Sequence, residues 1–177
     1  MRRFVLTYGL IAGAILSAMM FITFIGFHDQ IGFGSTGLIV GYTTMVIAFL
    51  MVYFGVKAYR DNVAPDGLTF GRAFKVGLLI TLIASACYVA SWQVIYYGFA
   101  PDFMDKYAEY SLEEARKSGA SAAELAEKSS EMKEFAELYR NPLVNIGFTF
   151  LEPLPVGLLF TLVTAGVLGR KRRGPSS

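Results

Sequence analysis

Residues 143–169 read LVNIGFTFLEPLPVGLLFTLVTAGVLG, an apolar run whose one charged side chain is Glu152. A hydrocarbon core about 30 Å thick needs roughly 20 residues of helix to cross it, so this run is long enough to span a bilayer. Within lipid, backbone N–H and C=O groups must bond inside the segment, which makes a helix the structure open to an isolated run of this kind. The stretch therefore predicts a membrane-spanning helix that carries a carboxyl group.

Three further runs, residues 4–27, 37–56 and 76–100, are apolar and carry no charge. Of the 177 residues, 54% are hydrophobic and 17% are charged, whereas ordinary soluble domains have about 45–50% and about 25%. We therefore predict an all-α fold: a four-span transmembrane helical bundle that forms a single integral membrane domain over residues 1–177. Arg2 and Arg3 precede the first run as in a signal peptide, but that run continues thirteen residues past Ala14. This length favours a retained helix over a cleaved signal.

The basic residues predict the orientation of the four spans. With the N-terminus inside, ten of the sixteen Lys and Arg side chains lie at inner span ends, which is the bias that sets membrane topology. The outer segment, residues 102–141, instead holds ten acidic side chains. We therefore expect both termini to be cytoplasmic. The ten inner basic residues are Arg2, Arg3, Lys57, Arg60, Arg72, Lys75, Arg170, Lys171, Arg172 and Arg173.

The outer segment is the one sizeable soluble piece. Ser111 and Glu114, and again Ser121 and Glu124, have the spacing of a capping box at a helix start. Gly119 lies between the two motifs and is suited to a left-handed helix stop. We expect a small extracytoplasmic helical hairpin over residues 102–141, folded over the outer mouth of the bundle.

Other local signals concern turns and helix packing. Pro65-Asp66-Gly67 predicts a turn, and Thr69 after it predicts an N-cap for the third span. We interpret His28 as an exposed loop residue and the tail 170–173 as an anchor for anionic lipid. Small residues at four-residue spacing predict close helix contacts in lipid; the candidate packing residues are Gly9, Gly13, Gly77 and Gly157.

Glu152 marks the candidate polar site. A charged group inside a span usually faces the bundle interior, and Pro153 and Pro155 remove the helical partners of the carbonyls of Thr149 and Leu151. The freed carbonyls, the carboxyl and the Thr149 hydroxyl could hold a proton or a small cation, as broken helices in transporters do. Alternatively, Glu152 is protonated and has a structural role only. Candidate partners on the third span, chosen by depth, are Tyr88, Ser91, Trp92 and Gln93.

The chemistry available to one chain narrows the function. A single histidine and the single cysteine Cys87 cannot form a metal cluster or a Cys/His catalytic pair, so we expect no metal, no cofactor and no enzyme activity. The four-residue basic tail does not suggest nucleic-acid binding. The favoured hypothesis is a non-catalytic interaction or accessory protein, in contact with the lipid bilayer and with a membrane-protein partner or in a homo-oligomer. The alternative is a small oligomeric proton- or cation-coupled transporter that uses Glu152.

Several motifs resemble those of a known family. They include Gly41, Lys57-x-Tyr59-Arg60-Asp61, Asn141-Pro142 and above all the Glu152-Pro-x-Pro-x-Gly157 element. From end to end the chain resembles the bacterial membrane family called domain of unknown function 4199. The resemblance implies a four-span protein of the bacterial inner membrane and supplies no substrate.

Overall fold

The computed structural model describes residues 1–26, 34–65 and 67–169, and every secondary-structure element in this part of the chain is a helix. The prediction of an all-α fold is therefore confirmed. His28, Asp66 and the basic tail, which carried three of the local predictions, lie outside the described residues. The elements are α1 (Arg2–Phe21), the π-helix η1 (Ile22–Gly26), α3 (Ser35–Val63), α4 (Phe70–Gly98), α5 (Phe103–Lys117), α6 (Ala122–Tyr139), α7 (Pro142–Leu151) and α8 (Pro153–Leu168).

Four helical segments are long and apolar enough to cross a membrane: Arg2–Phe24, Ser35–Val63, Phe70–Gly98 and Pro142–Leu168. They coincide with the four predicted runs, although α3 continues to Val63, beyond the predicted end at residue 56. Their outward faces are apolar, with Ile39 66% and Leu159 60% exposed. An exterior of this kind is unfavourable in water over a large area and indicates a membrane protein.

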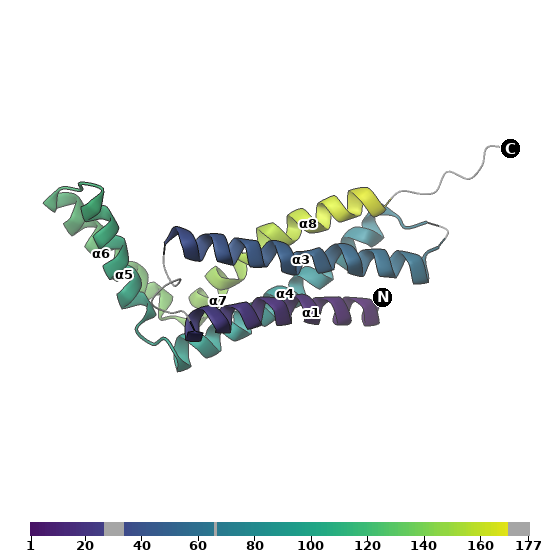
Figure 1. The fold of residues 1–177 in the computed structure, drawn as a ribbon, viewed down its shortest axis with the longest axis horizontal. Coiled ribbons are helices and arrows are strands. Elements are labelled where there is room, and N and C mark those ends of the chain that lie inside the picture. Colours follow the sequence, from purple (N-terminus) through teal and green to yellow (C-terminus); the bar gives the residue numbers. More distant parts are fainter. Residues whose placement is uncertain (27–33, 66, 170–177) are drawn as a thin grey trace.

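The bundle is built around α4, which packs against α1, α3 and α8. Its core holds fully buried apolar side chains from the second and third spans, among them Phe49, Val52, Val76 and Ile80. The side chain of Thr69 accepts a hydrogen bond from the backbone N–H of Arg72, which confirms the predicted N-cap of α4. α1 begins and α8 ends at the same end of the bundle (Figure 1).

Helices α5 and α6 form a helical pair that projects from the opposite end (Figure 1). Gly119 has a φ of 85° at the turn between them, and Ser121 forms the predicted capping box with Glu124. The capping box predicted at Ser111 is wrong, because α5 already starts at Phe103 and Ser111 lies inside it. The pair also extends away from the bundle, and its base adjoins the mouth over which we expected it to fold.

A second apolar cluster joins the base of the pair to the bundle. Met104 and Tyr139 are the buried residues of α5 and α6, and they pack with Met20, Trp92 and Tyr96. Rings dominate the contact: the ring centroids of Tyr96 and Tyr139 are 5.5 Å apart with an edge-to-face arrangement, which is a favoured geometry for aromatic pairs. The base of the pair is therefore held by packing, while the rest of it is largely exposed.

Candidate functional site

The fourth span is interrupted at Glu152, which separates the ten-residue α7 from the sixteen-residue α8. Pro153 and Pro155 lie in the first turns of α8. Because neither proline has an N–H, the carbonyls of Thr149 and Leu151 lack the partners that a continuous helix would give them. The sequence places a carboxyl group at this break, with α7 running toward the α5–α6 pair (Figure 1).

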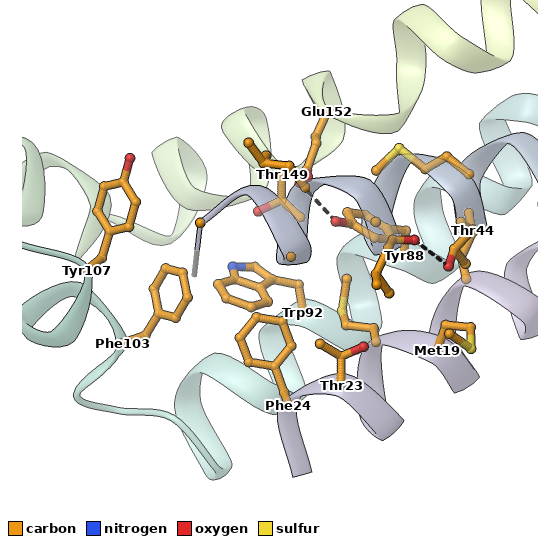
Figure 2. A pocket seen from close by; sticks show the side chains of 18 of the residues that line it. Met19, Thr23, Phe24, Thr44, Tyr88, Trp92, Phe103, Tyr107, Thr149 and Glu152 are labelled. Carbon is orange, nitrogen blue, oxygen red and sulfur yellow. Dashed lines mark hydrogen bonds between the residues drawn. The ribbon is translucent and has the colours of Figure 1, made fainter. Parts of the chain in front are cut away.

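The carboxyl group of Glu152 is held by a residue of α4. The hydroxyl of Tyr88 donates a hydrogen bond to Glu152 Oε2 over 2.8 Å (Figure 2). Glu152 as a residue is exposed and lines a pocket, so it is not enclosed in the packed core of the bundle. Of the four partners considered from depth, Tyr88 is the one that bonds it.

A seam of polar side chains continues from this point along α4 and α7. Asn145, Thr149 and Glu152 follow at intervals of four and three residues, which places them on one face of a helix. Gln93 Nε2 donates to Asn145 Oδ1 over 2.7 Å, and Thr149 Oγ1 donates to the Asn145 carbonyl over 2.8 Å. Asn145 is 0% exposed, and its Nδ2 has no hydrogen-bond partner among the described residues.

Tyr139, the last residue of α6, closes the seam toward the helical pair. Trp92 Nε1 donates a hydrogen bond to the Tyr139 hydroxyl over 2.9 Å, and the Tyr139 and Thr149 oxygens are 3.4 Å apart. Burial raises the pKa of the Tyr139 hydroxyl above its ordinary value, and Glu152 adds to this rise. The hydroxyl therefore stays protonated and neutral at physiological pH.

The structure thus brings together every residue predicted for the polar site: Glu152, Thr149, Pro153, Pro155, Tyr88 and Trp92. It also adds Asn145 and Tyr139, which sequence reasoning missed. The spacing of Asn145 from Thr149 and Glu152 could have revealed the first. Tyr139 comes from another helix, and no local signal pairs it with Trp92. Ser91, the remaining candidate, instead donates to Ser17 Oγ on α1 over 2.7 Å.

Beside the seam lies a pocket of about 750 Å³ between α1, α3, α4 and α7, with α5 and α6 at one end. This volume is in the range of small-molecule sites, about 300–1,000 Å³. Its walls are largely aromatic and aliphatic, and among the described residues Glu152 supplies the one acidic side chain of the lining. The labelled wall residues in Figure 2 include Phe24, Trp92, Phe103 and Tyr107 around one part of the pocket and Met19, Thr44, Tyr88 and Glu152 around the other.

A π-helix and a glycine are two notable parts of the pocket lining. The π-helix Ile22–Gly26 follows α1, and Thr23 and Phe24 within it line the pocket; π-helical turns are frequent at functional sites. On α3, Gly41 lines the pocket, and a Cβ placed on it would meet no atom within 4 Å. Gly41 therefore leaves volume in the pocket, and no other helix of the described residues packs against it.

The four candidate packing glycines lie where helices approach each other. A Cβ on Gly9 or Gly13 of α1 would come within 3 Å of Ile83 or Cys87 of α4. A Cβ on Gly77 would come within 3.1 Å of Thr161, and one on Gly157 would overlap Thr81 and press on Phe49. At this level Thr81 Oγ1 also donates to the Gly157 carbonyl over 3.2 Å. These contacts fix α1 and α8 against α4.

The fold and site define a class: an all-helical protein with four helices long and apolar enough to span a membrane, the last broken at a carboxyl group. The family model described as "Protein of unknown function (DUF4199)" matches residues 7–170, and the chain belongs to this family. No curated protein and no solved structure matches the chain.

Proposed function

We propose that this chain is a non-catalytic interaction protein of the bacterial inner membrane, and that it binds a partner protein through the α5–α6 pair. The observation that carries this proposal is the projection of the pair from one end of the bundle (Figure 1). Its buried residues, Met104 and Tyr139, lie at the base. Farther from the base, α6 is exposed at Glu127 and Glu131, and this surface is available for contact with another molecule.

The positions of the helix ends support the orientation. The six described basic residues of the predicted inner segments lie at the beginning of α1, at the end of α3 and at the start of α4. Basic residues at span ends favour the cytoplasmic side. With this orientation the α5–α6 pair is extracytoplasmic, and a partner would be an extracytoplasmic protein or domain.

The base of the pair links this surface to the polar seam. Tyr139 ends α6, accepts from Trp92 of α4 and lies beside Thr149 of α7. A partner that tilts α6 must therefore move or break contacts made by two of the spans. This connection supports an accessory role in which partner binding and the state of the seam depend on each other.

Site-specific photo-cross-linking in native membranes tests the proposal. A photoreactive residue replaces Leu138, which is 59% exposed on α6, and a matched probe replaces Val63 at the other end of the bundle. We expect one defined partner from position 138 and a different pattern from position 63. Recovery of only the chain itself or of random neighbours at position 138 would remove the partner hypothesis; the first of these results would indicate a homo-oligomer.

A second function, proton- or cation-coupled transport, is favoured by one observation: the Tyr88–Glu152 pair lies at a helix break and beside a pocket. Four spans leave little room for a path through one chain, so this function would require a homo-oligomer. Proton or sodium flux into proteoliposomes tests it, with Glu152→Gln compared with the exposed control Glu131→Gln. Flux that is lost in Glu152→Gln alone supports transport; equal flux in both, or none in the unchanged protein, excludes it.

A further inference from the structure

The pocket beside Glu152 combines two properties that rarely occur together. It is a space of about 750 Å³ with mostly apolar walls, and it contains a carboxyl group. Burying a carboxylate next to apolar surface is unfavourable unless it is paired with a partner or protonated. Tyr88 supplies one hydrogen bond, to Oε2, while a carboxylate offers about four acceptor positions on its two oxygens. The pocket therefore has capacity to accept a donor or a positive charge.

The aromatic walls point to the same kind of ligand. Trp92 and Phe103 meet edge to face with their ring centroids 4.8 Å apart, and Phe24 and Trp92 lie 5.2 Å apart on the same wall. Ring faces attract cations, most strongly when water is excluded, and Trp is the best of them. Met19, Met20 and Met45 add flexible, polarizable surface that adapts to different ligand shapes.

From these observations we propose that the pocket binds an apolar organic cation, a protonated or quaternary amine on a hydrophobic body. Glu152 receives the charge, the rings around Trp92 contact the body, and Gly41 leaves the volume that the body occupies. An anion of similar size and shape does not bind, because the Glu152 carboxylate repels a negative charge. This site lies between the spans and the base of the α5–α6 pair, and it does not depend on a partner protein of that pair.

The ligand could reach the pocket as a soluble amine or as the amine headgroup of a lipid. Both have the same chemistry at the carboxylate. Competition separates the two sources: mixed micelles with phosphatidylethanolamine displace a bound cation if the headgroup enters, whereas micelles with phosphatidylglycerol, whose headgroup has no amine, serve as the comparison. Displacement by phosphatidylethanolamine alone identifies a lipid amine as the ligand. Equal behaviour of the two lipids identifies a soluble cation. Either result supports the site once binding is shown.

The test uses purified full-length protein in a non-ionic detergent and tetraphenylphosphonium as the probe. Tetraphenylborate, which has nearly the same size and the opposite charge, is the matched control. Binding is measured by equilibrium dialysis against protein-free micelles. The emission of Trp92, the chain's single tryptophan, gives a second readout from the wall of the pocket itself.

Two variants make the test specific. Glu152→Gln removes the charge with little change in shape, and its amide oxygen can still accept from Tyr88. Gly41→Leu retains the charge and fills the pocket at a position where a Cβ has open space. Glu131→Gln, at an exposed position on α6, is the control for loss of one acidic residue.

We expect saturable binding of tetraphenylphosphonium with a change in Trp92 emission, and at least tenfold weaker binding in both Glu152→Gln and Gly41→Leu. Glu131→Gln should bind as the unchanged protein does, and tetraphenylborate should show no saturable binding. Equal binding of the two ions, or cation binding within threefold of normal in Glu152→Gln, would overturn the proposal. Absence of saturable binding to the unchanged protein would overturn it as well.

Discussion

The indole N–H of Trp92 donates to the hydroxyl of Tyr139 over 2.9 Å, and this bond joins α4, the third span, to the last residue of α6. Both side chains are buried, at 6% and 8% exposure. The bond therefore lies where the projecting helical pair, the polar seam and the pocket wall meet. Loss of this bond should therefore alter the helical pair, the polar seam and the pocket wall.

Tyr139→Phe removes the acceptor and leaves the buried Trp92 N–H without this partner. An unsatisfied buried donor costs about 1–3 kcal/mol, so the variant should unfold at a lower temperature in detergent. Hydrogen exchange should rise in α6 more than in α8, because the lost bond holds only the former. Tyr97→Phe is the matched control, since the Tyr97 side chain is 54% exposed. Equal exchange in the two variants would show that the bond does not hold the pair.

Gly157→Ala should destabilise the bundle, because the added Cβ would overlap Thr81 and lie 2.9 Å from Phe49. Extra volume in a tightly packed core costs about 1–3 kcal/mol. Gly166→Ala on the same helix is the control, since a Cβ there meets nothing within 4 Å. Thermal unfolding of the two purified variants measures the difference. Similar stability in both would mean that α8 can move away from α4 without loss.

Ser121→Ala removes one half of the capping box at the start of α6, where the Glu124 N–H donates to Ser121 Oγ over 3.3 Å. Loss of such a cap costs about 1 kcal/mol. We expect faster amide exchange in the first turn of α6 and little change in the four spans. Ser130→Ala, at an exposed position inside the same helix, should not raise exchange, because alanine is favoured there.

The same capping box makes the start of α6 sensitive to acid. Hydrogen bonding from the Ser121 backbone and side chain lowers the pKa of Glu124 below its ordinary value of 4.5. The stabilisation is present above the unfolded pKa and is lost as the pH falls through the lower, folded pKa. An NMR titration of the Glu124 carboxyl should therefore show a midpoint below 4.5 that moves upward in Ser121→Ala. A midpoint at or above 4.5 in the unchanged protein would contradict the bonded geometry.

The proposed orientation predicts which cysteines an impermeant thiol reagent reaches in intact cells. In a Cys87→Ser background, Ser118→Cys reports on the tip of the α5–α6 pair, and Val63→Cys reports on the opposite end of the bundle. We expect labelling of the first in intact cells and of the second only after lysis. The reverse pattern would place the helical pair in the cytoplasm.

The sequence predicted the spans well because their signal is local. Long uncharged runs form helices wherever the solvent is lipid. The caps at Thr69 and Ser121 were predictable because their signal is also local, since their partners lie three residues away. Ser111 has the same spacing to an acidic residue but lies inside α5. The motif describes a possible cap and does not determine where a helix begins.

The candidate site was predictable only in part, because its contacts join distant segments. The break at Glu152 follows from two prolines, but depth alone offered four partners on α4. Helix rotation decides among them: Tyr88 faces Glu152, whereas Gln93 faces Asn145 and Ser91 faces Ser17. The pocket depends on where α1, α3 and α7 diverge, and the hydrophobic periodicity of the sequence does not predict where helices separate.

The interruption at Glu152 also bears on the depth of this carboxyl group in the bilayer. The ten residues of α7 rise about 15 Å, and the sixteen of α8 about 24 Å, so neither piece alone matches a hydrocarbon slab about 30 Å thick. We therefore expect Glu152 to lie inside the hydrocarbon slab, away from both of its surfaces. A ligand that reaches the proposed pocket through the lipid would have to give up most of its hydration, which favours an apolar cation over a sugar.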